Sequence, residues 1–445
     1  MLSRHTFLRL FSESISMTSR PRVLILAEHC NPLWPSLPIV GYKYALALAQ
    51  HCDVRIVTQI RNKPAIIEDG RELDRFDFID NEYIARPMAR LANVLRGGDQ
   101  VAWSTAVIMG YPPYLAFERD TWKRYRRAIE AGEFDIIHRV TPMSPTQASY
   151  IAGRGGVPFI IGPLNGNLDW PKAFRSEQKR EKETLRKLRN FYKYLPYAKR
   201  TYTRAAAVLA AFRHTIDDIP FTPRERIVSF PEIGFDPDVF PSDRKRAPFD
   251  GPGEKVFLYA GRLVPYKVPE VVVRAFIGDE RLRQHRLRII GDGPERARIE
   301  AMVRDAGAED RVSFEGAKRQ VEVAEAMLTS DAFVFPSIRE LGAGVVIEAM
   351  ATGTLCIVTD YGAPGDLVSN GRGVALPLQP LDDLVLSCRA AMLDCLDRPA
   401  EHAALAKAGQ DHALANYTWD AKARQTVEVY RAVLSGRSLE GVSPY

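Results

Sequence analysis

The stretch that decides the fold is Arg339–Gly353, R-E-L-G-A-G-V-V-I-E-A-M-A-T-G, which follows an apolar run ending at Phe335. Two glycines, Gly342 and Gly344, precede an apolar segment that is typical of a buried helix. Small residues at a helix start let an anion reach backbone N–H groups that have no partner within the helix. The stretch therefore predicts an anion-binding loop between a strand and a helix of an α/β unit.

Two acids, Glu340 and Glu348, flank this helix start. A carboxylate inside an apolar helix is costly to bury without hydrogen-bond donors, and the hydroxyl groups of a ligand are suitable donors. For a single acid, the alternative is that Glu348 caps a neighbouring backbone group. Two acids eight residues apart around a glycine-rich helix start favour the ligand-binding interpretation.

Short apolar runs alternate with helical patterns along the 445-residue chain, which predicts doubly wound parallel sheets. The expected strands of the first half are Val23–Ala27, Val54–Thr58, Ile136–Val140, Val157–Ile161, Ala206–Ala211 and Ile227–Phe230. Those of the second half are Val256–Ala260, Leu287–Ile290, Val312–Phe314, Ala332–Phe335 and Leu355–Val358. The alternation restarts after a segment rich in proline, glycine and charge between Pro231 and Glu254. We therefore expect two Rossmann-like domains facing across a cleft, where ligands bind at the carboxyl ends of the strands.

The loop after Val256–Ala260 carries a cationic pair, Arg262 and Lys267. Arginine holds a phosphate through two parallel hydrogen bonds, and lysine supplies a compact charge. The alternative is a solvated pair on a loop. The turn Gly291-Asp292-Gly293-Pro294 follows the next strand, but it is not G-x-G-x-x-G, so a dinucleotide-binding fingerprint loses support.

Together these features resemble the family-four glycosyltransferases, which have the GT-B fold. The matching motifs occur in the family's order from about 256 to 376: G-R-L-x-x-x-K, G-D-G-P, V-S-F-E-G, F-P-S-x-x-E, the E-x7-E pair and E-A-M-A-x-G. The resemblance implies a retaining transfer of a sugar from a UDP- or GDP-sugar to a hydroxyl acceptor, in polysaccharide or glycolipid synthesis. It also implies that no metal or other cofactor is required.

The resemblance assigns a role to each matching residue. The residues expected to act in catalysis are Glu340, which holds the transferred sugar, and Arg262 and Lys267, which bind the diphosphate. The remaining donor-binding set comprises Gly41, the base-side residues Gly291, Gly293 and Ala317, the backbone of Ala343, Gly344 and Val345 at the distal phosphate, and Glu348 at the ribose.

The first half matches the family less closely. Val40-Gly41 stands where relatives carry Gly-Gly, and Gly41 still lets the backbone approach a phosphate. His138-Arg139-Val140 stands where relatives carry H-x-H, so His138 is either a sugar contact or a buried strand residue. The loop G-P-L-N-G at 162–166 resembles the family's G-P-x-x-G-G loop, which places Asn165 and Gly166 on the acceptor side of the cleft.

We expect four segments. Residues 1–20 are an extended start or a targeting tail outside the fold, 21–234 the acceptor domain, 235–424 the nucleotide-sugar-binding domain, and 425–445 a helix that returns to the first domain. Asp236 and Asp238 form a D-x-D pattern, but I-G-F-D-P-D-V-F-P resembles the family's interdomain junction, so a linker is favoured over a metal site.

Composition narrows the class of protein. The five cysteines form no C-x-x-C pair and are expected to be reduced core thiols. No apolar run approaches the roughly 20 residues needed to cross a bilayer, and a cytoplasmic location is expected. The net charge of +6 is concentrated in 172–204, which holds twelve Lys or Arg and three acids, so a nucleic-acid partner is not expected.

The basic segment 172–204 carries an apolar stripe formed by Leu185, Leu188, Tyr192 and Leu195. One interpretation is a solvated helix packed on its own domain. The other is peripheral docking on an anionic membrane at its inner face, which suits a lipid-linked acceptor; the resemblance leaves a saccharide or a lipid-linked acceptor open.

Two rival functions fit parts of the same pattern. One is another GT-B enzyme, such as a sugar-nucleotide epimerase, which releases the nucleotide without an acceptor. The other is a non-catalytic partner that binds nucleotide sugars.

Overall fold

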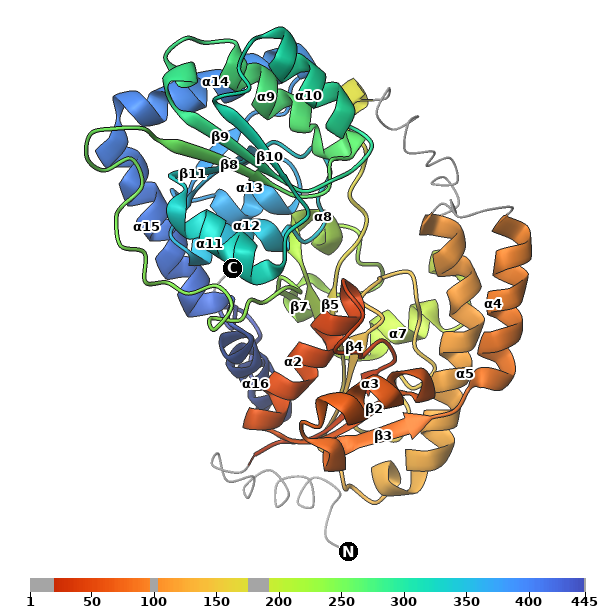
Figure 1. Cartoon of the computed structure of the whole chain (residues 1–445). Coiled ribbons are helices and arrows are strands. Elements are labelled where there is room, and N and C mark those ends of the chain that lie inside the picture. Colours follow the sequence, from red (N-terminus) through yellow and green to blue (C-terminus); the bar gives the residue numbers. More distant parts are fainter. Residues whose placement is uncertain (1–19, 97–102, 175–191, 444–445) are drawn as a thin grey trace, which may run out of the picture.

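The computed structural model describes residues 20–96, 103–174 and 192–443, which form two parallel α/β domains (Figure 1). The first sheet has seven strands in the order β3-β2-β1-β4-β5-β6-β7, and all neighbouring strands are parallel. Its strands are β1 (Arg22–Ala27), β2 (Asp53–Gln59), β3 (Phe76–Ile79), β4 (Ile136–Thr141), β5 (Phe159–Leu164), β6 (Ala205–Ala210) and β7 (Ile227–Ser229).

The second sheet has six parallel strands in the order β10-β9-β8-β11-β12-β13. Its strands are β8 (Val256–Ala260), β9 (Arg286–Ile290), β10 (Val312–Gly316), β11 (Ala332–Phe335), β12 (Leu355–Thr359) and β13 (Val374–Leu376). In each sheet the strand order reverses once, between β1 and β4 and between β8 and β11. Ligands of doubly wound sheets bind beside the carboxyl ends of the strands at such a reversal.

Helices cover the faces of both sheets, as parallel sheets require (Figure 1). The helices of the first half are α2 (Leu37–His51), α3 (Lys63–Asp69), α4 (Glu82–Arg96), α5 (Trp103–Glu130), α7 (Ala198–Arg204) and α8 (Phe212–Ile216). Those of the second half are α9 (Pro269–Ile277), α10 (Arg296–Asp305), α11 (Gln320–Thr329), α12 (Gly344–Ala351), α13 (Ala363–Val368), α14 (Leu381–Asp397), α15 (Pro399–Asn416) and α16 (Trp419–Ser435).

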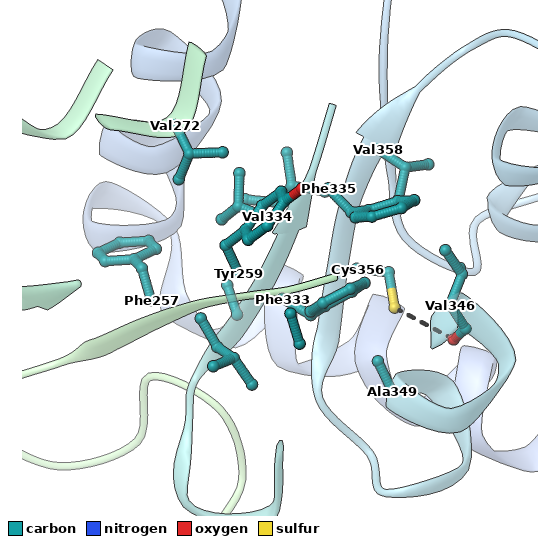
Figure 2. Close-up of a cluster of buried hydrophobic side chains, with 14 of the residues drawn as sticks. Phe257, Tyr259, Val272, Phe333, Val334, Phe335, Val346, Ala349, Cys356 and Val358 are labelled. Atoms are coloured by element: carbon teal, nitrogen blue, oxygen red, sulfur yellow. Dashed lines mark hydrogen bonds between the residues drawn. The ribbon is translucent and has the colours of Figure 1, made fainter. Parts of the chain in front are cut away.

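The two central strands of the second sheet are held by aromatic packing (Figure 2). Phe333 and Phe335 of β11 stack with ring centroids 5.5 Å apart, and Tyr259 of β8 lies 5.9 Å from Phe335. All three side chains are completely buried. Burying a side chain of this size contributes roughly 1.5–3 kcal/mol, so the ends of β8 and β11 are firmly placed. The positions of the loops that follow β8 and β11 are therefore fixed by this packing.

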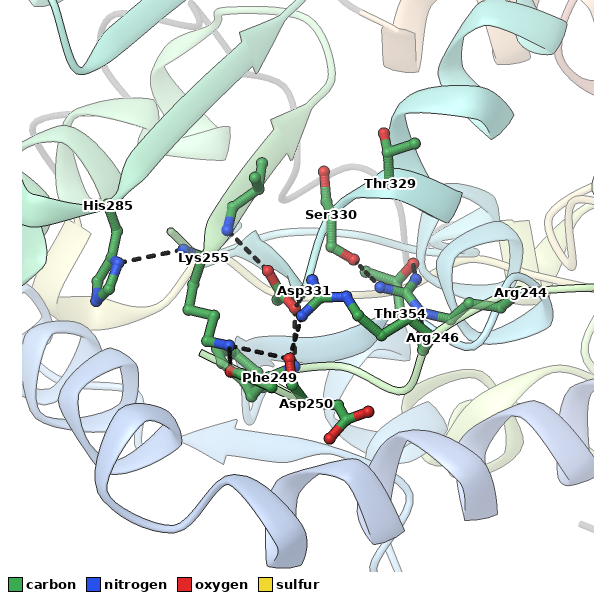
Figure 3. A network of polar contacts seen from close by, with 12 residues as sticks. Arg244, Arg246, Phe249, Asp250, Lys255, His285, Thr329, Ser330, Asp331 and Thr354 are labelled. Atoms are coloured by element: carbon green, nitrogen blue, oxygen red, sulfur yellow. Dashed lines mark hydrogen bonds and ion pairs between the residues drawn. The ribbon is translucent and has the colours of Figure 1, made fainter. Parts of the chain in front are cut away.

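A buried carboxylate fixes the interdomain linker to the second sheet (Figure 3). Asp331 precedes β11 and is completely buried. Its carboxylate accepts hydrogen bonds from the backbone N–H groups of Phe249 and Val256 and from the Arg246 guanidinium, each at 2.8 Å. The linker end and the start of β8 are thereby attached to one side chain.

The last helix, α16, packs against the first domain, mainly against α2. The Tyr44 hydroxyl of α2 lies 2.5 Å from Thr426 Oγ1 of α16. Thr418 caps the helix by accepting from Ala421 N at 3.1 Å, and its backbone pairs with that of Phe235 in the linker. The chain therefore crosses between the domains twice, and both crossings meet at Phe235 and Thr418.

All the strands expected from the sequence are present, with some shifts of their ends. The sequence prediction missed β3 and β13, which lie at the edges of the two sheets. β3 reads F-D-F-I with a half-buried second residue, and β13 has only three residues, so neither shows the long apolar run of the central strands. The expected class, two Rossmann-like parallel-sheet domains, is confirmed.

The five cysteines are buried free thiols, and burial raises the pKa of each. Across 20–96, 103–174 and 192–443, no helix combines the length and apolar character needed to cross a membrane.

We predict that Asp331→Ala lowers the free energy of unfolding by about 3 kcal/mol, because two buried N–H groups and a guanidinium lose their acceptor. Differential scanning calorimetry measures the change. The matched control is Asp310→Ala, which removes an acid that is 72% exposed. Its expected loss is below about 0.5 kcal/mol. Equal losses in the two variants contradict the anchoring role.

Candidate active site

The loop after β8 is hydrogen-bonded to the loop after β11. Both loops lie at the carboxyl ends of these strands, where the strand order reverses. The Tyr266 carbonyl accepts from Ile338 N at 3.0 Å and from Ser337 Oγ at 3.2 Å. On the other side, Gly261 N donates to Ile290 O at 2.9 Å, which joins the β8 loop to the end of β9. The loops that follow β8, β9 and β11 are therefore joined at the carboxyl edge of the second sheet.

One cation and one carboxylate meet at this place. Lys267 Nζ lies 3.1 Å from Glu340 Oε1, and their side chains are only 12% and 16% exposed. Lys267 Nζ also lies 4.8 Å from the ring centroid of Phe335, at the end of β11. Arg262 is exposed, and its Nη2 donates to the Tyr266 hydroxyl at 2.8 Å. The structure thus brings together Lys267 and Glu340, while Arg262 leaves the same loop after β8 and its side chain meets Tyr266.

Helix α12 begins directly beside Glu340. Its N-cap, Ala343, has left-handed backbone angles (φ 47°, ψ 46°), an uncommon conformation for a residue with a side chain. The first N–H groups of the helix, including those of Gly344 and Val345, have no acceptor within it, and the helix dipole adds a partial positive charge there. The loop and helix start are therefore suited to an anion that Lys267 also reaches.

Glu348 lies one turn further along α12 and is half-buried. Burial raises the pKa of Glu348 to about 7, while the charge of Lys43 in α2 acts to lower it. No hydrogen bond from another described residue reaches the Glu348 carboxylate. It is therefore an acceptor open to the hydroxyl groups of a ligand.

The turn after β9 presses against the turn after β8. Gly291 has φ 132°, and a Cβ atom there would lie 1.9 Å from Gly261 O, so only glycine fits. A Cβ on Gly293 would lie 2.4 Å from Leu263 O. Gly291 N donates to Gly316 O at 2.7 Å, which brings the turn beside the exposed Ala317. The three expected base-side residues consequently share one rim of the site.

A cavity of about 480 Å³ opens between the domains. Its walls include 167–169 of the first domain and 360–362 of the second. A Cβ atom on Gly362 would lie 2.7 Å from the Glu340 carbonyl, so this cavity adjoins the loop that carries Glu340. The expected cleft between the two domains is present.

The loop that was expected on the acceptor side lies at this cleft. Asn165 is buried, and its Nδ2 donates to Glu232 Oε1 at 2.5 Å. Gly166 N donates to Thr215 Oγ1 of α8 at 3.1 Å. Gly41 in α2 packs against the loop after β1, because a Cβ atom there would lie 2.4 Å from His29 O.

The structure does not bring His138 into this group. It is completely buried in β4, with Nε2 2.7 Å from Gly162 O and Nδ1 2.5 Å from the Tyr430 hydroxyl. A carbonyl oxygen only accepts, so Nε2 carries the proton and Nδ1 accepts from Tyr430. Burial lowers the pKa of His138 to about 4, so it is neutral at physiological pH. Both ring nitrogens are engaged within β4, β5 and α16.

One further group lies at the site that the motifs did not indicate. Glu232 falls in the expected linker between Pro231 and Glu254, and its Oε1 accepts from Asn165 Nδ2. The signal for Glu232 was an acid between apolar residues before the interdomain junction. The Asp236–Asp238 pair is a turn, since Asp236 Oδ1 accepts from Asp238 N at 3.1 Å.

The basic segment lies largely outside the described residues. Leu185 and Leu188 fall in 175–191, outside the residues that the structure describes. Tyr192 is buried in the first domain, and its hydroxyl donates to Asp218 at 3.3 Å. Leu195 packs, partly buried, against the same core.

Comparison with solved structures defines the class of this fold. The chain is similar to sucrose-phosphate synthase from Thermosynechococcus elongatus, at 19% identity and a TM-score of 0.59, over 94% of this chain and 100% of that one. It is also similar to HepE of Anabaena in complex with UDP and glucose, at 15% identity and a TM-score of 0.55, over 93% and 100% of the two chains. The architecture is the GT-B fold.

The family follows from the sequence comparison. Residues 242–409 match the family of glycosyl transferases group 1. The D-inositol 3-phosphate glycosyltransferase of Kineococcus radiotolerans is 29% identical over 211 residues, which are 43% of this chain and 47% of that protein. The chain spans about half the length of the first curated relatives it matches. The family resemblance stated from the motifs is confirmed.

Proposed function

We propose that the protein is a glycosyltransferase that transfers a sugar from a nucleotide diphosphate sugar to a hydroxyl group of an acceptor. The observation that carries this proposal is the contact of Lys267, in the loop after β8, with Glu340, in the loop that leads into α12, at the strand reversal. Arg262 lies in the same loop as Lys267. Two cations and the N–H groups of a helix start match a diphosphate in charge and in hydrogen-bonding capacity.

These groups also suit the bond that breaks. As the sugar leaves, negative charge builds on the distal phosphate of the nucleoside diphosphate. Fixed cations and oriented N–H groups stabilise that charge without having to reorganise during the reaction. We therefore assign the diphosphate to Arg262, Lys267 and the backbone of 343–345, and we propose that the transfer needs no metal ion.

The carboxylates of Glu348 and Glu340 are assigned to the two sugar rings of the donor. Glu348 accepts from the ribose hydroxyls and Glu340 from hydroxyls of the transferred sugar, while the base lies against Gly291, Gly293 and Ala317. Configuration is retained by a front-face path, in which the acceptor enters beside the departing phosphate. Glu340 is consequently not assigned as a covalent nucleophile, although paired carboxylates have that role in retaining glycosidases.

The donor is a UDP- or GDP-sugar, and the UDP bound to the structurally similar HepE supports the former. The acceptor enters the interdomain cavity beside Asn165 and Gly166, while Gly41 of α2 is assigned to the donor side, where its backbone approaches a phosphate. We assign the acceptor to the saccharides or lipid-linked saccharides of polysaccharide or glycolipid synthesis, and docking through 172–204 on an anionic membrane belongs to this proposal. We assign His138 a structural role. Its two ring nitrogens hydrogen-bond to Gly162 O of β5 and to the Tyr430 hydroxyl of α16, so they hold these elements to β4.

Product analysis with UDP-glucose, UDP-N-acetylglucosamine and GDP-mannose against a panel of hydroxyl acceptors tests the function. Glycosylated acceptor together with UDP or GDP is expected. Release of nucleotide with an isomerised sugar and no glycosylated acceptor indicates an epimerase instead. Binding of the donors without any turnover indicates a non-catalytic partner.

We predict that Arg262→Ala and Lys267→Ala each reduce kcat/KM for transfer by at least about 100-fold, because each removes about 3 kcal/mol of stabilisation from the leaving phosphate. Circular dichroism should show both variants folded. Arg304→Ala removes an exposed arginine of α10 in the same domain and should transfer sugar as the unaltered protein does. Near-normal transfer by both site variants would falsify the diphosphate assignment.

A second prediction concerns pH. The pKa of Glu348 is raised to about 7, so its carboxyl is increasingly protonated as the pH falls below 7. Ribose hydroxyls donate to the ionised form, so the affinity for the nucleoside diphosphate should rise up to pH 7 and level above it, by up to about tenfold per pH unit. Titration calorimetry with UDP and GDP between about pH 5.5 and 8 measures this dependence.

The control for this prediction is Glu348→Gln. The terminal phosphate ionises near pH 6 and contributes equally in both proteins. The difference between their pH dependences therefore isolates Glu348. Parallel curves for the two proteins would show that Glu348 does not meet the ribose in its ionised form.

A further inference from the structure

Glu232 lies where the first domain, the linker and the second domain touch. It is only 3% exposed, and it stands just after β7 at the beginning of the linker. Its Oε1 accepts from Asn165 Nδ2 of the first domain at 2.5 Å. The same oxygen lies 2.2 Å from the position that a Cβ atom on Gly342 of the second domain would occupy. One carboxylate oxygen is therefore packed between the acceptor-side loop and the loop that enters α12.

Keeping an acid at this position is costly. Burial raises the pKa of Glu232 to about 7, and its Oε2 has no hydrogen-bond partner among the described residues. The opposing charge comes from Lys422 of α16, which is completely buried with Nζ 4.0 Å from the ring centroid of Phe230. Burial lowers the pKa of Lys422 to about 7, and Glu232 acts to raise it. An apolar side chain at position 232 would fill the same space without the free-energy cost of burying a carboxylate. Packing alone therefore does not account for Glu232.

The contacts of Asn165 indicate that reason. Its backbone N–H donates to Met143 O at 2.7 Å, within the first domain. Its Oδ1 lies 3.4 Å from His214 Nε2 and from Thr215 Oγ1, also within the first domain. Its Nδ2 group instead donates to Glu232, which adjoins Gly342. Glu232 thus connects a residue of the acceptor side to the loop between Glu340 and α12.

We propose that Glu232 is a positioning residue that holds the acceptor-side loop at Asn165 in register with the donor-side loop at Gly342. This inference rests on the proposed function for its catalytic meaning, because the two loops carry the two substrates of the transfer. The carboxylate fixes the Asn165 amide by a charge-assisted hydrogen bond, and close packing on Gly342 carries any movement of one loop to the other.

Hydrogen–deuterium exchange of the full-length protein without any ligand tests the connection. In Glu232→Ala, the segment 162–168 should exchange about tenfold faster, since a charge-assisted hydrogen bond of about 1.5 kcal/mol is lost. Glu232→Gln should restore most of the protection, because an amide oxygen still accepts from Asn165. Unchanged exchange of 162–168 in Glu232→Ala overturns the proposal.

Two more variants separate positioning from general destabilisation. Glu118→Gln alters another buried carboxylate of the first domain, whose partners Tyr114, Ser149 and Ile151 lie apart from this contact. It should leave 162–168 unchanged, and an equal acceleration there overturns the proposal. Gly342→Ala should accelerate 162–168 from the other domain, but add nothing further in a Glu232→Ala background. Additive effects of these two substitutions also contradict the connection.

Addition of UDP or GDP separates this inference from the proposed function. Protection of 339–346 by either nucleotide reports the donor site, and its absence in the unaltered protein contradicts the proposed function while the ligand-free measurements still decide the role of Glu232. Where 339–346 is protected, 162–168 should be protected as well in the unaltered protein and in Glu232→Gln, but not in Glu232→Ala. Equal protection of 162–168 in all three proteins overturns the positioning role.

Discussion

The site depends on the junction between β8 and β11 in the middle of the second sheet. The strand order reverses there, so the loops that leave the two strands diverge and leave room between them. Tyr259 and Phe335 pack 5.9 Å apart and fix the strand ends, and the Tyr266 carbonyl joins the two loops by accepting from Ser337 and Ile338. Lys267, Glu340 and the start of α12 take their positions from this junction.

The sequence was most informative where local chemistry and topology coincide. Buried parallel strands are continuous apolar runs, so the central strands, among them Ala332–Phe335, could be predicted. A cation that directly follows such a strand must lie at the carboxyl edge of the sheet. The positions of Arg262 and Lys267 relative to Glu340 followed from that rule. The edge strands β3 and β13 were missed because short, partly exposed strands leave no such run.

Contacts between residues distant in the chain could not be predicted. Whether His138 faced the cleft or the core depended on Tyr430, 292 residues away, whose hydroxyl engages its Nδ1. Glu232 reads as an ordinary linker acid until Asn165 and Gly342 are placed around it. Each of these contacts joins elements that the chain brings together only on folding.

The central claim is that this junction binds a nucleoside diphosphate chiefly through its phosphates. Titration calorimetry that compares UDP with uridine and GDP with guanosine tests it most directly. Several charge-assisted hydrogen bonds at about 1.5–3 kcal/mol each predict that at least one diphosphate binds about 100-fold or more tightly than its nucleoside. If neither diphosphate binds more tightly than its nucleoside, the account of Arg262, Lys267 and α12 as the diphosphate site is contradicted.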